Sequence, residues 1–157
     1  MNIITGVNSA IVHNNKILLI KRIKEPYTGY WSMPGGKLEF GETIEECAVR
    51  ELKEETNIDS EFERLGGIAS EVVYNKGKKK AHFLLFVCKL KPLHLNHKET
   101  NEGKVRWVSV KDLDKEKIIP SDVLMIKEFI LKENNLDVHK IKMIEDGDRY
   151  YVEAFEK

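Results

Sequence analysis

The pattern of apolar and polar positions predicts strands at the beginning of the chain. Residues 3–12 (IITGVNSAIV) are rich in β-branched side chains, and residues 16–22 (KILLIKR) form a second apolar run. Asn14 and Asn15 between them are typical of a tight turn, so the two runs are expected to pair as a hairpin. Residues 24–30 contain a proline and a glycine, which indicate a loop.

Further strands are predicted after residue 60. Residues 61–74 have the composition of an extended segment, with a bulge or bend at Gly66 and Gly67. The near-continuous apolar run 81–90 (AHFLLFVCKL) is typical of a central, buried strand. The other elements expected here are a turn at 75–78, a polar loop at 92–103, a strand at 104–110, and a C-terminal hairpin of strands 138–144 and 150–155.

Helical periodicity occurs twice. Apolar residues recur every four positions from Ile44 to Leu52 and predict a helix over residues 44–56, and Thr43 with Glu46 forms the pattern of a capping box. A second amphipathic helix is predicted over residues 121–133, with a buried side of Leu124, Ile126 or Lys127, Ile130 and Leu131. Mixed strands with two helices predict an α/β fold.

The first predicted helix carries an unusual concentration of acid. Glu51, Glu54 and Glu55 stand at i, i+3 and i+4, so their carboxylates share one face and repel one another. Mg²⁺ and Mn²⁺ prefer oxygen ligands, and such a cluster supplies them. Glu42 lies just before the helix and can fold back toward this face, and Arg50 can hold a carboxylate by a bidentate pair. The alternative is a solvated acidic helix face without a metal.

The spacing of the whole stretch from residue 36 to residue 58 decides between these alternatives. It resembles the signature of the Nudix hydrolases, whose fixed positions correspond here to Gly36, Glu42, Arg50, Glu51, Leu52, Glu54, Glu55, Asn57 and Ile58. Asn57 departs from the signature, which has glycine there. Because asparagine tolerates the left-handed conformation of a helix C-cap better than other non-glycine residues, the departure is expected to be structural.

The resemblance implies a fold and a reaction. The implied fold is a mixed β-sheet sandwiched between helices (α/β/α), to which the C-terminal hairpin is an extension. The implied reaction is metal-dependent hydrolysis of a nucleoside diphosphate linked to another group. Carried over residue by residue, the resemblance gives Glu51, Glu54, Glu55 and the carbonyl of Gly36 as metal ligands, Arg50 as the residue that orients a glutamate, and Glu42 as support for Arg50 or the metal.

The general base and the substrate contacts lie partly outside this stretch. In the resembled family the base is a glutamate of the signature or of a later loop, which here means Glu99 or, by preference, Glu102. Arg22 and Lys37 are candidates for phosphate contacts, with exposed surface cations as the alternative. The candidate for a contact with the base is Asp122; alternatively, Ser121 or Asp122 only caps the second helix.

The remaining sequence indicates the substrate less directly. Residues 30–36 and 120–122 are similar to the MutT-type enzymes, which favours a (deoxy)nucleoside triphosphate or its oxidised form, converted to a monophosphate and pyrophosphate. A proline associated with ADP-ribose enzymes is absent after the signature. Nucleotide sugars and dinucleoside polyphosphates remain alternatives, the latter because of Tyr74. A non-catalytic nucleotide sensor is a further alternative, although such domains usually lose signature carboxylates, which are all present here.

Length and composition set the general frame. A chain of 157 residues predicts one domain, with a core at about 3–134 and the hairpin at about 137–156. Lys plus Arg and Asp plus Glu are both 26, so no basic excess points to nucleic-acid binding. No apolar run approaches a membrane span. Cys47 and Cys88 are expected to be buried free thiols. These features predict a soluble cytoplasmic protein. The resemblance implies that its partners are small nucleotide substrates, and a homodimer contact is an alternative use of the hairpin.

Overall fold

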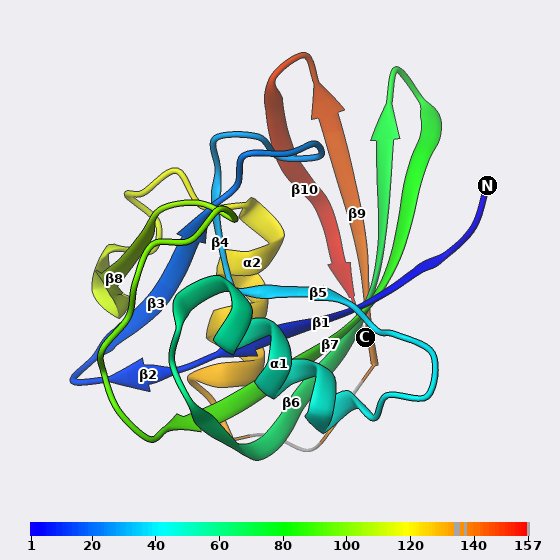
Figure 1. Ribbon diagram of the computed structural model, residues 1–157. Helices are drawn as coiled ribbons and strands as arrows, with labels where there is room; N and C mark the ends of the chain where they lie inside the picture. The colour runs from blue at the N-terminus through cyan, green and yellow to red at the C-terminus, as the bar shows by residue number, and fades with distance from the viewer. Residues whose placement is uncertain (134–135, 137, 157) are drawn as a thin grey trace.

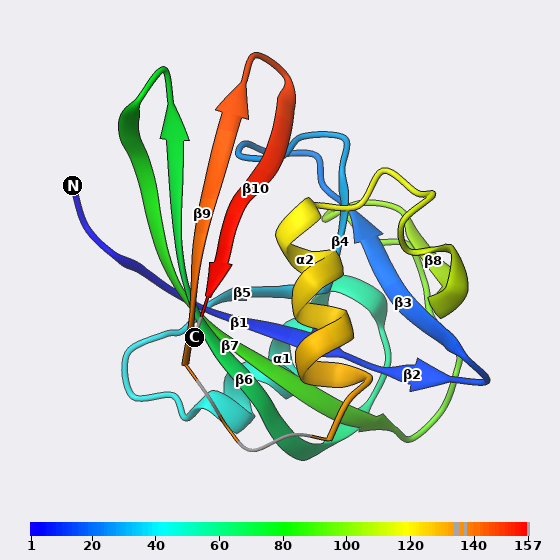
Figure 2. The ribbon, with the colours of Figure 1, turned by 180° about the vertical axis from the view of Figure 1, so that it is seen from behind.

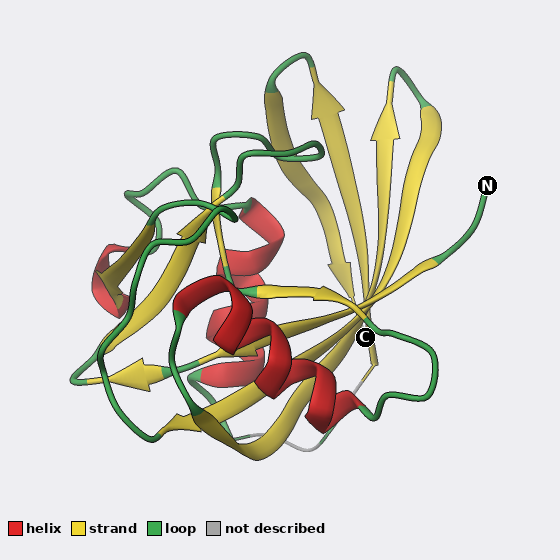
Figure 3. Ribbon diagram, in the orientation of Figure 1, coloured by secondary structure: helices red, strands yellow, loops and turns green. Residues whose placement is uncertain are grey.

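The computed structural model describes residues 1–133, 136 and 138–156. Within this part, the strands form a six-stranded sheet in the order β10-β9-β6-β7-β1-β5 and a four-stranded sheet in which β3 pairs with β2, β4 and β8 (Figure 1; Figure 3). The strands are β1 (Ile4–Ala10), β2 (Val12–His13), β3 (Lys16–Lys21), β4 (Trp31–Ser32), β5 (Gly35–Lys37), β6 (Ser60–Asn75), β7 (Lys78–Pro92), β8 (Val105–Ser109), β9 (Val138–Asp146) and β10 (Arg149–Glu156).

The larger sheet is mixed. Strand β1 runs parallel to β7 and β6 runs parallel to β9, whereas the β6–β7, β9–β10 and β1–β5 pairs are antiparallel. The apolar strand predicted at 81–90 lies inside β7, between β6 and β1. The C-terminal hairpin is confirmed, and its place is now defined: β9 pairs with β6, so the hairpin extends the sheet at that edge.

The hairpin predicted between residues 3–12 and 16–22 is largely wrong. The first run splits at the fully buried Ile11, and β1 before it joins the six-stranded sheet. Only β2 pairs with β3, through Val12 opposite Ile17 and His13 opposite Lys16. The turn at Asn14–Asn15 is present, with both residues at positive φ. Turn signals report local conformation, whereas the partner of β1 depends on residues about 80 positions away along the chain.

Two helices cover opposite faces of the six-stranded sheet, as comparison of the two views shows (Figure 1; Figure 2). Helix α1 (Ile44–Thr56) buries Ala48 and Leu52 against one face, in a cluster that includes Val7 and Leu90. Helix α2 (Pro120–Met125) continues into the π-helical segment η2 (Ile126–Ile130) on the other face. A short 3-10 helix, η1 (Val110–Asp112), follows β8. The α/β/α arrangement implied by the sequence is therefore confirmed.

The second helix differs from its prediction in bounds and in orientation. It begins one residue earlier, at Pro120, and η2 ends at Ile130. Its buried side carries Met125, Ile126, Phe129 and Ile130, whereas Leu131 is 42% exposed. At the end of η2, Arg64 of β6 donates hydrogen bonds to the carbonyls of Phe129, Ile130 and Lys132. An arginine bound to the last carbonyls stabilises a helix end, and this contact is not visible in local periodicity.

The irregularity predicted at Gly66 and Gly67 is confirmed. The register of β6 against β7 shifts between Leu65 and Gly67. The ring of Phe129 packs directly over Gly67, where a Cβ atom would collide with it. The bulge therefore brings η2 into close contact with the sheet.

Two further observations concern the predicted boundary between core and hairpin and the possibility of a membrane span. Residues 134, 135 and 137, where the sequence places the boundary between core and hairpin, lie outside the described residues. Among the residues that the structure does describe, no helix is long and apolar enough to cross a membrane.

Reduction is expected to leave the melting temperature unchanged. Cys47 and Cys88 are free and fully buried, and burial raises the pKa of each thiol to about 12. Such thiols are unreactive at neutral pH, since the thiolate is the nucleophile. The measurement is thermal unfolding with and without a phosphine reductant; a clear drop in melting temperature on reduction would contradict the assignment.

Candidate active site

The acidic helix α1 forms as its local sequence predicts. The Thr43 hydroxyl accepts a hydrogen bond from the Glu46 amide at 3.1 Å, and the Glu46 carboxylate accepts one from the Thr43 amide at 2.9 Å. Asn57 closes the helix in the left-handed conformation, with φ 66°. The capping box and the interpretation of Asn57 are thus confirmed. Both ends of the helix are fixed by residues next to the signature carboxylates.

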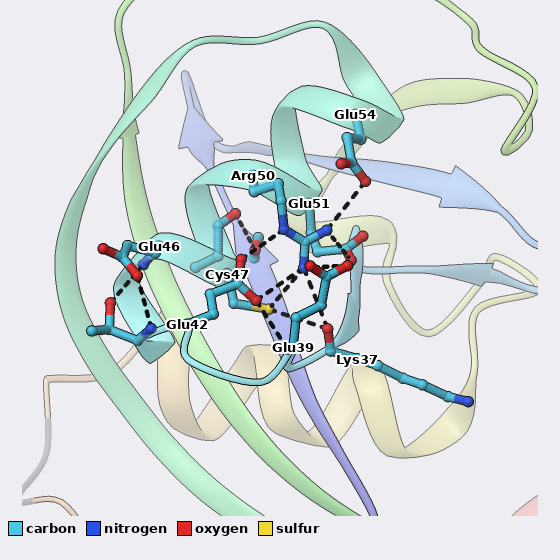
Figure 4. A network of polar contacts seen from close by, with 11 residues as sticks. Lys37, Glu39, Glu42, Glu46, Cys47, Arg50, Glu51 and Glu54 are labelled. Atoms are coloured by element: carbon cyan, nitrogen blue, oxygen red, sulfur yellow. Dashed lines mark hydrogen bonds and ion pairs between the residues drawn. The ribbon is translucent and has the colours of Figure 1, made fainter.

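Arg50 lies at the centre of the carboxylates (Figure 4). Its Nε and Nη2 donate to the two oxygens of Glu42 at 2.6 and 3.0 Å. Its Nη1 donates to Glu51 at 2.9 Å and to Glu54 at 3.3 Å. The hydrogen bonds from Arg50 lower the pKa of Glu42 to about 2. Since bidentate arginine–carboxylate pairs have fixed geometry, Arg50 sets the positions of the surrounding glutamates.

Glycines before the helix allow the carboxylates to approach the main chain. The Glu51 carboxylate lies so close to Gly36 that a Cβ there would collide with its oxygens. Glu55 Oε2 accepts a hydrogen bond from the Gly35 amide at 3.2 Å. Burial, together with the smaller effect of the charges of Glu51 and Glu102, raises the pKa of Glu55 to about 8, although the Gly35 amide and Arg22 lower it. Strand β5 and the helix therefore enclose a partly desolvated concentration of negative charge.

These residues fit a divalent cation chemically, although their oxygens do not yet converge. Among the described residues, no three His, Cys, Asp or Glu side chains form a ready-made metal cluster; Arg50 instead binds Glu51 and Glu54. The available donors are carboxylate oxygens, which hard cations prefer. Because Gly36 has no side chain, the Glu51 carboxylate lies directly against the main chain of β5 at this position. A cation there would offset the mutual repulsion of Glu51, Glu55 and Glu102.

The structure brings the loop candidate Glu102 to the same place. Glu102, Glu55 and Arg22 line a small cavity of about 80 Å³. The loop is attached to α1 by Thr100, whose hydroxyl donates to the carbonyl of Glu55 at 3.3 Å and accepts from the amide of Glu102 at 3.1 Å. Both loop glutamates are exposed, but the other candidate, Glu99, lines neither of the two cavities. The preference for Glu102 therefore has a geometric basis.

A larger cavity of about 760 Å³ adjoins the signature residues. Arg22 lies at its rim, with Nε donating to the Pro26 carbonyl at 2.7 Å. Lys37 also lines it, and its carbonyl accepts a hydrogen bond from Arg50. A cavity of this size falls in the range of small-molecule sites. Two cations thus line the cavity together with the signature glycines.

Asp122 lies at the inner wall of this cavity, and the interpretation of it as a helix cap is wrong. The N-cap is Ile119, and no side chain makes a capping hydrogen bond at that end. Asp122 is 4% exposed, and its Oδ2 accepts a hydrogen bond from the Met33 amide at 2.7 Å. Burial raises the pKa of Asp122 to about 7; the charge of Glu71 raises it, and Arg22 and the Met33 amide lower it.

Sequence reasoning missed the other polar residues of the cavity. Glu71 of β6 is 3% exposed, and its Oε2 accepts a hydrogen bond from the Tyr27 hydroxyl at 3.2 Å. A signal for it exists, because an acid stands at an inward position of a strand whose neighbours on that face, Ala69 and Val73, are buried. Tyr150 and Glu145 of the C-terminal hairpin also line the cavity; only long-range strand pairing reveals them.

Comparison with known proteins agrees with this geometry. A family model, the NUDIX domain, matches residues 5–129. The chain belongs to the Nudix family. It is 48% identical over 65 residues to an ADP-ribose pyrophosphatase of Methanocaldococcus jannaschii, a match that covers 41% of this chain and 38% of that protein. An uncharacterized Nudix hydrolase of Bacillus subtilis is 28% identical over 130 residues, covering 82% of this chain and 80% of the relative.

Among solved structures, the mutator MutT protein from Bacillus halodurans superposes with a TM-score of 0.76 at 27% identity, covering 98% of this chain and 97% of that chain. The chain is therefore a MutT-like Nudix hydrolase with the Nudix fold. Members of this family are generally dependent on divalent metals and act on small nucleotide substrates.

Proposed function

We propose that the protein hydrolyses (deoxy)nucleoside triphosphates, including oxidised forms, to a nucleoside monophosphate and pyrophosphate. The observation that carries the proposal is the cavity of about 760 Å³, which is lined by the signature glycines Gly35 and Gly36, by the cations Arg22 and Lys37 and by the buried Asp122. Such a lining suits a molecule with phosphates near Arg22 and Lys37 and a polar ring near Asp122. We expect residues 1–157 to act as one domain.

In the proposed reaction, a water oxygen attacks the α- or the β-phosphorus atom and the anhydride bond between these two atoms breaks, which separates the nucleoside monophosphate from pyrophosphate. Glu51, Glu54, Glu55 and the Gly36 carbonyl would hold Mg²⁺ or Mn²⁺, which supplies charge neutralisation and water activation. Arg50 orients the glutamates through its hydrogen bonds to Glu51 and Glu54. Arg22 and Lys37 bind phosphate oxygens. Glu102 accepts the proton of the water, since it lies beside Glu55 in the small cavity.

The test is a panel of substrates with products separated by chromatography. The panel contains the four dNTPs, an oxidised guanine nucleotide, ADP-ribose, a nucleotide sugar and a dinucleoside polyphosphate, each with and without Mg²⁺. Monophosphate and pyrophosphate from dNTPs, with the highest kcat/KM, would support the proposal. Equal binding of nucleotides without turnover would instead indicate a sensing module.

A second candidate substrate is ADP-ribose. The specific observation in its favour is the 48% identity over 65 residues to a protein named ADP-ribose pyrophosphatase. That match covers 38% of the relative, and the missing proline after the signature disfavours this substrate. A higher kcat/KM for ADP-ribose than for any dNTP in the same panel would replace the first candidate by the second.

Asp122→Asn is expected to change the ranking of kcat/KM among the four dNTPs. Asparagine keeps an oxygen for the Met33 amide but presents N–H donors in place of a carboxyl group, so the hydrogen-bond pattern offered to the base changes. Such mismatches cost about 1–3 kcal/mol when they leave buried groups unpaired. An unchanged ranking in steady-state kinetics would remove Asp122 from base recognition.

The same substitution should also change how the stability of the protein depends on pH. The pKa of Asp122 is raised in the folded protein, from its ordinary value to about 7. Its contribution to stability is therefore complete below the unfolded pKa and is lost as the pH rises through about 7. The melting temperature of the asparagine variant, relative to wild type, should increase from pH 5 to pH 8. A constant difference across this range would contradict the assignment.

A further inference from the structure

The large cavity extends beyond the part of the chain that defines the family. The NUDIX model matches residues 5–129, but the cavity is also lined by Glu145 and Tyr150 of the β9–β10 hairpin. In Figure 1 this hairpin stands beside the β6–β7 hairpin, and the loop after β3 crosses toward it. The Tyr30 hydroxyl of that loop donates to the Asp148 carbonyl at 3.5 Å. The hairpin is thus a wall of the cavity as well as an edge of the sheet.

A network of hydrogen bonds fixes the position of Tyr150. Its hydroxyl donates to Glu145 Oε1 at 2.9 Å. Glu145 is 6% exposed and also accepts from Lys80 at 2.6 Å and from Asn75 at 2.7 Å. Both partners come from the β6–β7 hairpin, so the network ties the two hairpins together. Burial and the adjacent Glu145 raise the pKa of Tyr150 to about 12, so its hydroxyl stays protonated at neutral pH.

Two tyrosines pack against the ring of Tyr150. Tyr27 lies 4.5 Å from it at an interplanar angle of 62°, and Tyr30 lies 5.7 Å from it at 83°. Tyr27 is itself held by Glu71 through its hydroxyl. Neither neighbour lies parallel to Tyr150, and no stacked partner of this ring occurs in the part of the chain that the structure describes. The ring is therefore rigid, partly buried and available to the cavity.

The residues around Tyr150 suit a planar aromatic group of a ligand. Val73, Phe83 and Ile119 supply apolar surface around it. Arg22 and Lys37, the cations expected to meet phosphate, line the same cavity next to the signature glycines. A nucleotide carries the matching groups, namely anionic phosphates and a flat, π-rich base. Stacking on an aromatic side chain is tolerant of base identity because every base has a π-face.

We propose that the C-terminal hairpin completes the base-binding end of the cavity and that Tyr150 stacks on the nucleobase of the substrate. This inference rests on the proposed function in that the ligand is a nucleotide. The network through Glu145, Lys80 and Asn75 keeps the ring in place before the ligand arrives, which reduces the ordering cost of binding. The hairpin then determines affinity for the base, while Asp122 contacts its edge.

The experiment measures binding without turnover. Titration calorimetry with an α,β-methylene dNTP gives the Kd for wild type, Tyr150→Ala, Tyr150→Leu, Tyr150→Phe and Tyr151→Ala. Tyr151 is the matched control, because it is the next residue on the same strand, is 50% exposed and does not line the cavity. Inorganic tripolyphosphate is the matched ligand, because it lacks sugar and base. Thermal unfolding verifies that each variant is folded.

Tyr150→Ala and Tyr150→Leu are expected to raise the Kd of the nucleotide analogue about 5- to 150-fold, the range of one stacked base. Tyr150→Phe should recover most of the affinity, since it keeps the ring. Tyr151→Ala should bind as wild type, and tripolyphosphate should bind all folded variants alike. The leucine variant fills the space of a missing ring with apolar atoms and serves if the alanine variant does not fold.

Several results would overturn the inference. These are an unchanged Kd for both Tyr150→Ala and Tyr150→Leu, an equal loss for Tyr151→Ala, an equal loss of tripolyphosphate binding, or no binding of the analogue by wild type. Failure of the proposed reaction is distinguishable: base-dependent binding that needs Tyr150, without any hydrolysis of dNTPs in Mg²⁺, would sink the reaction and leave the stacking intact. Hydrolysis of dNTPs by wild type, together with an unchanged Kd in the Tyr150 variants, would support the reaction and exclude the stacking.

Discussion

Replacing Glu55 by glutamine is expected to reduce kcat about 10²- to 10³-fold, the scale of losing a major electrostatic stabiliser at a reacting centre. Glutamine retains an oxygen for the Gly35 amide, which Glu55 now binds at 3.2 Å. Because the pKa of Glu55 is raised to about 8, glutamine replaces a largely protonated carboxyl group in the metal-free protein at neutral pH. The fold should therefore persist, and the melting temperature should not fall. The measurements are kcat with saturating Mg²⁺ and thermal unfolding.

The control for this prediction is Glu45→Gln. Glu45 lies in the first turn of the same helix, is exposed and has no part in the network around Arg50. Its replacement should leave kcat within about twofold of wild type, since exposed first-turn acids contribute only a few tenths of a kcal/mol to the helix. Glu54→Gln should resemble Glu55→Gln. Near-normal turnover in both Glu54 and Glu55 variants would show that the metal site is misplaced.

How much of the fold the sequence predicts depends on how local the signal is. The bounds of α1 and the conformation of Asn57 follow from capping residues within a few positions of the helix ends. The partner of β1 does not, because its apolar residues are equally compatible with a hairpin and with the distant strand β7. The contact at the end of η2 likewise involves Arg64, more than 60 residues earlier. Periodicity locates a face of an element but not its partner.

The candidate site shows the same division. The spacing of Glu51, Glu54 and Glu55 is contained in one helix, so their proximity follows from the sequence. The participation of Arg50 in several pairs at once depends on side-chain geometry, and the sequence indicates only one of them. Glu71 and Tyr150 meet at the cavity because β6, β9 and β10 lie side by side in one sheet. Composition around either residue does not indicate that they share a ligand.

Removal of divalent metal is expected to abolish hydrolysis, and added Mg²⁺ or Mn²⁺ should restore it. Without a bound metal ion, the carboxylates around Arg50 would repel an incoming polyphosphate. The side chains of Arg22 and Lys37 alone cannot balance the combined negative charge of the carboxylates and the polyphosphate. The carboxylate oxygens of Glu51 and Glu54 must also leave Arg50 in part to bind a metal. The first measurement is the rate of pyrophosphate release after exhaustive chelation, with metal content verified by elemental analysis.

A second measurement of the same prediction is independent of activity. A cation that binds only the folded protein stabilises it by RT ln(1 + [L]/Kd), or about 2.7 kcal/mol at 100 times Kd. Mg²⁺ should therefore raise the melting temperature of wild type, and Glu55→Gln should reduce this rise because one carboxylate ligand is lost. Glu45→Gln should show the wild-type rise, since Glu45 lies outside the cluster. Full turnover in metal-free protein, or an identical Mg²⁺-induced rise in all three proteins, would exclude the metal site at Glu51, Glu54 and Glu55.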